Sequence, residues 1–115
     1  MRRAVIDLGT NTFNLLIAEV NHHGIEVVHS EKEGVALGMG GINKNVLAPE
    51  AYDRGIKTLT HFKEVCKKYE TSEIRGIGTS ALRDASNSKT FIDEVRTKLG
   101  IEIEIVSGHR EAELI

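Results

Sequence analysis

The first third of the chain consists of short apolar runs separated by turns. Residues 3–8 and 13–20 are apolar and rich in β-branched side chains, as buried strands are, and residues 25–30 alternate along a third run. Turn-forming residues separate these runs at 9–12 and at 21–24. Three consecutive strands joined by such short turns predict an antiparallel meander.

The pattern then changes to a helical period. The glycines within residues 33–48 predict the tail of a strand and then a mobile loop. Pro49 suits the first position of a helix, and Glu50 suits its first turn. The apolar residues that follow recur at helical spacing and predict a long amphipathic helix; they are Tyr52, Ile56, Leu59, Phe62, Cys66 and Tyr69.

Two more strands and two more helices complete the pattern. Residues 74–78 and 102–106 predict strands, and residues 89–99 predict a helix that ends at Gly100. Ser107 is a suitable N-cap for a last helix. The order β-β-β-α-β-α-β-α predicts an α/β fold in which two crossovers add parallel strands to the meander, giving a mixed five-stranded sheet. This is the order of the ribonuclease-H-like fold, the half-unit of the actin-like phosphotransferases.

Composition excludes several classes of protein. The chain has 115 residues, enough for one domain, with a net charge of −2, 4% aromatic residues and no Trp. The near-equal numbers of basic and acidic residues do not favour binding to nucleic acid or to an anionic membrane. No apolar run is long enough to span a bilayer. Cys66 is the single cysteine, which suits a reducing cytoplasm. The chain ends in the first turns of a helix without a stop signal, so we expect a piece of a longer protein.

The first candidate for chemistry is the turn after the first strand. Its residues Gly9, Thr10, Asn11 and Thr12 combine a tight turn with hydroxyl and amide donors, as a phosphate-binding nest does. Asp7 would repel a phosphate unless a cation lay between them, so the pair implies a divalent metal, Mg²⁺ held through water. The alternative is a β-hairpin in which Asp7 merely accepts hydrogen bonds from the turn.

The second candidate follows the strand at 74–78. Thr79 and Ser80 can donate to an anion beyond the carboxyl end of that strand, and Arg83 could return a guanidinium to the same point. The alternative is an ordinary helix start followed by a solvated arginine.

The third candidate follows the last strand. Glu111 and Glu113 lie in the opening turns of the last helix, where either could be a base for water or a surface acid that suits the helix dipole. Spacing does not choose between them. Because all three candidates follow strand ends, we expect them to meet at one edge of one sheet and to form a cleft that handles metal and phosphate.

Three segments together resemble the exopolyphosphatase and guanosine-pentaphosphate phosphohydrolase family, over nearly the whole chain. They are AVIDLGTNTFNLLIAEV, GIGTSALRDASNSKTFIDEV and GIEIEIVSGHREAELI. The resemblance implies the N-terminal part of a larger two-lobed phosphatase. It also implies Mg²⁺-assisted hydrolysis of the terminal phosphate of inorganic polyphosphate, or of the 5′ phosphate of guanosine pentaphosphate. It leaves the choice of substrate open, and it allows a homodimer of the full-length protein.

The resemblance also implies a role for each candidate residue. Asp7 matches the metal-associated acid, residues 9–12 match the first phosphate loop, and Glu111 matches the general base. Thr79, Ser80 and Arg83 match the second phosphate-contacting strand end. Two features depart from the family: Ala36 stands where a basic residue is usual, and the family's second phosphate loop, Asp-x-Gly-Gly-Gly-Ser, would come beyond Ile115.

Two other functions fit the same fold. One is a module that binds polyphosphate or a guanosine alarmone without turnover. The other is a phosphotransferase of the sugar-kinase or actin-like type, because those proteins also open with an acid-Gly-Thr loop. Glu111 favours the hydrolase, since hydrolysis needs a base for water and phosphoryl transfer from a nucleotide does not need one at that point.

Overall fold

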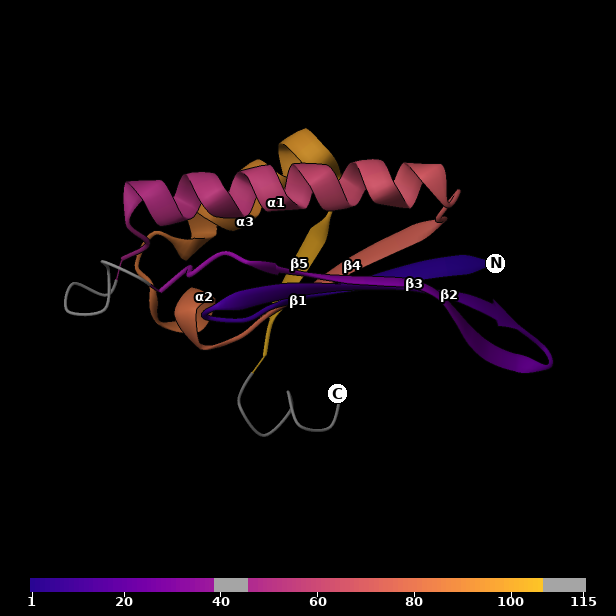
Figure 1. Cartoon of the computed structure of the whole chain (residues 1–115). Helices are drawn as coiled ribbons and strands as arrows, with labels where there is room; N and C mark the ends of the chain where they lie inside the picture. The colour runs from indigo at the N-terminus through magenta and orange to yellow at the C-terminus, as the bar shows by residue number, and fades with distance from the viewer. Residues whose placement is uncertain (39–45, 107–115) are drawn as a thin grey trace.

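A five-stranded mixed sheet with helices packed on one of its faces forms the body of the protein (Figure 1). The computed structural model describes residues 1–38 and 46–106. The strand order is β3-β2-β1-β4-β5. The elements are β1 (Arg2–Leu8), β2 (Thr12–Asn21), β3 (Gly24–Gly34), α1 (Pro49–Lys68), β4 (Glu73–Gly78), α2 (Ser80–Asp84), α3 (Ser88–Leu99) and β5 (Glu102–Ile105). This arrangement confirms the predicted α/β fold of the ribonuclease-H-like type, whereas the central part of the predicted loop and the last helix lie outside the described residues.

The meander of β1, β2 and β3 forms as predicted, with one strand longer than expected. β2 pairs antiparallel with β1 and with β3, and the β2–β3 ladder continues until Thr12 lies opposite Gly34. The alternating pattern predicted the third strand over residues 25–30, with the tail of a strand expected from residue 33. In the structure Glu31 faces α1 and accepts a hydrogen bond from His61, so a polar residue occupies a helix-facing position. The β2–β3 hairpin reaches beyond the end of α1 (Figure 1).

The parallel part of the sheet places the ends of three strands together. β4 pairs parallel with β1, with Leu8 opposite Gly78, and β5 pairs parallel with β4. α1 and α3 provide the crossovers and lie on the same face of the sheet (Figure 1). The connection after β4, predicted as a link, contains the five-residue helix α2. The carboxyl ends of β1, β4 and β5 therefore share one edge, as a binding site in such a sheet requires.

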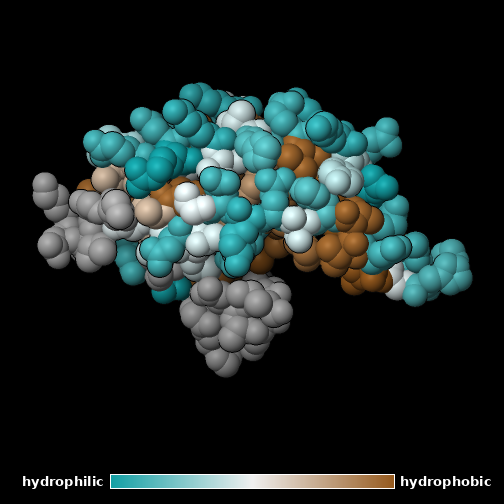
Figure 2. Space-filling view, viewed as in Figure 1, coloured by the Kyte–Doolittle hydropathy of each residue, from teal (hydrophilic) through white to brown (hydrophobic). Residues whose placement is uncertain are grey.

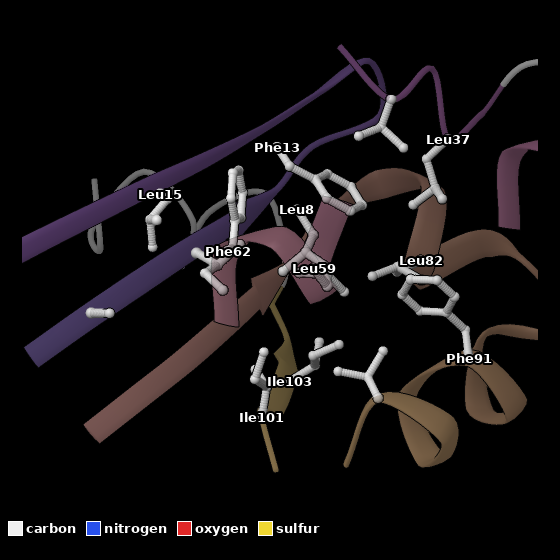
Figure 3. Close-up of a cluster of buried hydrophobic side chains, with 14 of the residues drawn as sticks. Leu8, Phe13, Leu15, Leu37, Leu59, Phe62, Leu82, Phe91, Ile101 and Ile103 are labelled. Atoms are coloured by element: carbon white, nitrogen blue, oxygen red, sulfur yellow. The ribbon is translucent and has the colours of Figure 1, made fainter. Parts of the chain in front are cut away.

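An apolar core lies between the sheet and the two longer helices. Leu8 from β1, Leu59 and Phe62 from α1, and Phe91 from α3 are among its fully buried side chains (Figure 3). The predicted signals at the helix ends are confirmed, since Pro49 begins α1 and Gly100 ends α3 in the left-handed conformation with φ 67°. Among the helices that the structure describes, none is both long enough and apolar enough to cross a bilayer.

The opposite face of the sheet is partly exposed and partly apolar. Val5 and Leu16 lie side by side in the β1–β2 ladder and remain 39% and 43% exposed. Val27 on β3 is 55% exposed. Brown apolar side chains gather on the side of the sheet away from the helices, toward the β2–β3 hairpin (Figure 2). Asp7 belongs to this face, because its neighbours in β1 point into the core.

Candidate functional site

The turn between β1 and β2 is closed tightly by its own backbone. The N–H of Gly9 donates to the carbonyl oxygen of Thr12 at 3.1 Å, directly after the pair formed by Leu8 and Phe13. A Cβ atom at Gly9 would lie 2.9 Å from that same oxygen, a distance that real side chains do not adopt. Glycine is therefore required for the close approach of the two strands, and the Gly9 N–H serves the turn itself.

Asp7 lies one residue before the end of β1, on the face away from α1 and α3. Ile6 and Leu8 on either side are fully buried in the core, so strand alternation directs the Asp7 carboxylate to the other face. The residue is half-buried, and its Oδ1 is shielded from solvent. Asn14 of β2 and Ile77 of β4 are its partners in the two ladders. A carboxylate in this place is a hard oxygen ligand of the kind that Mg²⁺ prefers.

The segment after β3, residues 35–38, packs against the turn between β1 and β2, a contact that the sequence did not predict. The N–H groups of Val35 and Ala36 both donate to the carbonyl oxygen of Asn11, at 2.9 and 2.8 Å. The N–H of Gly38 donates to the carbonyl oxygen of Thr10 at 3.2 Å. Ala36 adopts a positive φ of 50°, which is unusual for a residue with a side chain. The glycine-rich segment thus begins as an ordered contact of the candidate phosphate turn.

Arg54 of α1 binds the backbone of residues 35–38 through two hydrogen bonds. Its Nε donates to the carbonyl oxygen of Val35 at 2.6 Å, and its Nη2 donates to that of Ala36 at 3.1 Å. Only a cationic residue near the start of a predicted helix marks this role in the sequence. The backbone of Ala36 is therefore in direct contact with a guanidinium from another element.

Thr79 joins the second candidate segment to the first. Its backbone N–H and its hydroxyl both donate to the carbonyl oxygen of Leu8, at 3.3 and 3.2 Å. The residue is only 4% exposed, so its two donors serve the end of β1. The backbone of Ser80 begins α2 directly after it. The structure thus brings the two predicted phosphate segments into direct hydrogen-bond contact.

Arg83 links α2 to the end of β5. Its Nη1 donates to the carbonyl oxygen of Val106 at 2.9 Å, and the N–H of Val106 donates to Gly78 at 3.1 Å. Its Nε lies 3.9 Å from Oδ1 of Asp84, and 37% of its side chain is exposed. The guanidinium lies where the third candidate segment begins. Glu111 and Glu113 are outside the described residues, so the predicted base and the predicted grip of Arg83 on phosphate stay predictions.

Asn87 is a second residue that the sequence analysis did not single out. Its side-chain amide accepts a hydrogen bond from the N–H of Leu47 at 2.8 Å and donates to the carbonyl oxygen of the same residue at 3.1 Å. This clamp attaches the link between α2 and α3 to the segment that enters α1. An amide that satisfies a backbone donor and acceptor in this way leaves no signal in the sequence except its residue type.

The described residues fit a metal held by few protein ligands. Within residues 1–38 and 46–106, no group of three or more His, Cys, Asp and Glu side chains could hold a metal ion. Asp7 could therefore contribute one hard oxygen ligand, and Mg²⁺ often takes only one or two carboxylates from a protein.

Comparison with models of protein families shows to which family the chain belongs. Residues 16–115 match the Ppx/GppA phosphatase family. The chain is a member of the Ppx/GppA phosphatase family. The matched residues begin within β2, after the turn at 9–12.

Solved structures agree with this assignment over the whole chain. An exopolyphosphatase from Cytophaga hutchinsonii is 40% identical, with a TM-score of 0.95, and the match covers all of this chain and 37% of that one. An exopolyphosphatase-like protein is 33% identical, with a TM-score of 0.92, over 98% of this chain and 34% of that one. The present chain therefore spans little more than a third of these relatives.

More distant structures share the fold alone. A Ppx/GppA family member from Aquifex aeolicus is 22% identical, with a TM-score of 0.90, over 96% of this chain and 36% of that one. RuvC from Thermus thermophilus is 15% identical, with a TM-score of 0.53, over 93% of this chain and 62% of that one. The second match agrees with the ribonuclease-H-like order of strands that the sequence predicted.

Proposed function

We propose that the full-length protein is a phosphohydrolase that releases the terminal phosphate of inorganic polyphosphate, or the 5′ phosphate of guanosine pentaphosphate. The observation that supports this most is the direct hydrogen bonding of Thr79 to Leu8, which joins the two candidate phosphate segments at the carboxyl edge of the sheet. Membership in the Ppx/GppA phosphatase family and the 40% identity to an exopolyphosphatase favour polyphosphate as the first substrate to test.

In this proposal the residues of the chain bind and orient the phosphate chain. Asp7 would hold Mg²⁺ through water, and the donors of Thr10, Asn11 and Thr12 would bind phosphate oxygens. The bound metal would neutralise charge that develops on the transferred phosphoryl group. The guanidinium of Arg83, a residue of α2, reaches the residue that follows β5, and from there it would bind a phosphate oxygen. Glu111 takes the proton of the attacking water.

The family membership, the lone Cys66 and the charge balance lead us to place this reaction in the cytoplasm. We retain the homodimer as a property to be measured on the full-length protein. Binding without turnover and phosphoryl transfer from ATP are the competing functions, and one set of assays separates all three.

The test is phosphate release by the full-length protein with Mg²⁺. Polyphosphate and guanosine pentaphosphate are supplied separately, and an ATP-dependent phosphorylation assay is run in parallel. We expect Glu111→Gln to abolish phosphate release while polyphosphate binding is retained, because Gln keeps the shape and cannot accept the proton. Glu113→Gln is the matched control and should keep turnover. Unchanged turnover in Glu111→Gln would remove Glu111 from the mechanism, and saturable binding without any release by the wild type would establish the binding module instead.

A further inference from the structure

We propose that Arg54 is a positioning residue that sets the shape of the phosphate-binding turn, and thereby the affinity of the protein for its polyphosphate substrate. The inference rests on the proposed function. It assigns a role to a residue of α1 that belongs to none of the three candidate segments.

The first step is the chain of hydrogen bonds from α1 to the turn. Arg54 donates to the carbonyl oxygens of Val35 and Ala36, and the N–H groups of these same two residues donate to the carbonyl oxygen of Asn11. The guanidinium is therefore separated from the turn by a single pair of residues. Because Arg is planar and carries its donors in a fixed fork, it can hold two successive carbonyls in one orientation.

The second step is the strained conformation that Arg54 holds in place. Ala36 has a φ of 50°, and a residue with a Cβ occupies this region only when its surroundings impose it. The peptide unit between Val35 and Ala36 is bound at both ends, because its carbonyl oxygen accepts from Arg54 and its N–H donates to Asn11. Removal of Arg54 would let Ala36 relax to negative φ, and its N–H could not then keep the same direction toward Asn11.

The third step is the close packing that brings the segment and α1 together. Val35 and Leu37 are buried in the core on either side of Ala36. A Cβ atom at Gly55, the residue after Arg54, would lie 3.4 Å from Leu37 and 3.0 Å from Phe91. The helix thus carries a glycine where it approaches this segment closely. The apolar contacts fix the position of the segment, which leaves Arg54 to fix its peptide orientation.

The fourth step is the consequence for the turn. Gly38 donates to Thr10 and lies so close to it that a Cβ would be 2.7 Å from the Thr10 methyl group. Residues 35–38 therefore contact the turn at both Asn11 and Thr10, whose donors are proposed to bind phosphate. A phosphate bound in the ground state and in the transition state uses the same donors, so their misorientation should raise KM more than it lowers kcat.

The test compares Arg54→Met and Arg54→Lys with wild type in the full-length protein. Met keeps the length of the side chain without its donors, and Lys keeps the charge without the fork. We expect KM for inorganic polyphosphate to rise about fivefold to tenfold in both variants, the loss of one to two hydrogen bonds, with kcat changed by less than about threefold. We also expect amide hydrogen exchange at Val35 and Ala36 to become about tenfold faster.

Arg96→Met is the matched control. Arg96 is a half-exposed arginine of α3 that pairs with Asp93 and Glu102, and its loss should leave KM and the exchange at residues 35 and 36 unchanged.

Wild-type KM in folded Arg54→Met overturns the inference, even if the variant melts at a lower temperature. Full recovery of KM by Arg54→Lys also overturns it, because charge alone would then suffice. If Arg54→Met does not fold, Arg54→Lys and its exchange at residues 35 and 36 decide. Absence of phosphate release from the wild type would instead contradict the proposed function.

Discussion

The hydroxyl of Thr79 donates to the carbonyl oxygen of Leu8 at 3.2 Å, beside a second hydrogen bond from the Thr79 N–H to the same oxygen. These two hydrogen bonds join the end of β4 to the end of β1, directly after the last pair of the β1–β4 ladder, Leu8 and Gly78. Sequence analysis placed Thr79 among the donors to phosphate. In the structure both of its donors serve Leu8, the residue directly before the turn at residues 9–12.

Removal of the Thr79 hydroxyl should cost stability while the fold is retained. We expect Thr79→Val to lower the free energy of unfolding by about 1 kcal/mol, because the buried carbonyl oxygen of Leu8 keeps the hydrogen bond from the backbone N–H. Urea unfolding followed by circular dichroism measures this. Thr79→Ser keeps the hydroxyl and should lose less, so a larger loss in the Ser variant would contradict the assignment of the hydroxyl.

The contact between Gly38 and Thr10 makes a second prediction. We expect Gly38→Ala to destabilise the protein by about 1–3 kcal/mol, because the new Cβ would lie 2.7 Å from the Thr10 methyl group and one of them must move. Gly34→Ala is the matched control, since no atom lies within 4 Å of a Cβ at Gly34, and its effect should stay within about 0.5 kcal/mol. Equal thermal unfolding midpoints for the two variants would show that a side chain at residue 38 does not collide with Thr10.

The architecture could be predicted because it follows from local patterns. Alternation and apolar runs located all five strands, and helical spacing located α1 and α3 with their starting Pro49 and closing Gly100. The two crossovers then fixed which strands run parallel. α2 was missed because five residues are too short to show a helical period. β3 continues beyond the predicted residue 30, because Glu31 keeps its place in the strand by pairing with His61 of α1.

The internal supports of the site could not be predicted for a different reason. Arg54 binds backbone carbonyls of residues 35 and 36, and Asn87 binds the backbone of Leu47, forty residues away along the chain. Any residue presents the same backbone groups, so these partners leave no trace in the sequence. Residue types and strand ends indicated which segments meet. Which acceptor each hydrogen-bond donor reaches depends on tertiary packing, as the bonds of Arg54, Asn87 and Thr79 show.

The pairing of Glu31 with two histidines predicts a dependence of stability on pH. Glu31 accepts hydrogen bonds of 2.8 Å from His29 on its own strand and from His61 on α1. Hydrogen bonding from His29 lowers the pKa of the Glu31 carboxyl most, burial opposes this, and His61 adds to the lowering. A carboxyl whose pKa is lower in the folded protein stabilises the fold above its unfolded value of 4.5, and this stabilisation is lost as pH falls through the folded pKa.

Comparison of wild type with Glu31→Gln tests this dependence. We expect the wild type to be the more stable protein at pH 7, and we expect the difference in unfolding free energy to shrink as the pH falls below about 4.5. Urea unfolding at pH 7, 5 and 3 measures the difference. Glu26→Gln, an exposed carboxyl on the same strand, should show no such trend. A difference between wild type and Glu31→Gln that stays constant from pH 7 to pH 3 would contradict the role of this network.

The position of Asp7 predicts how the proposed phosphate release by the full-length protein should depend on Mg²⁺. The carboxylate is half-buried beside the turn and carries a charge that would repel phosphate unless a cation is shared between them. We expect chelation of divalent metal to stop phosphate release, and we expect Asp7→Asn to raise the Mg²⁺ concentration for half-maximal release about tenfold or more. Asp53→Asn, an exposed acid of α1, is the control. If Asp7 serves only the hairpin, Asp7→Asn will lower the unfolding free energy and leave the Mg²⁺ titration where the wild type has it.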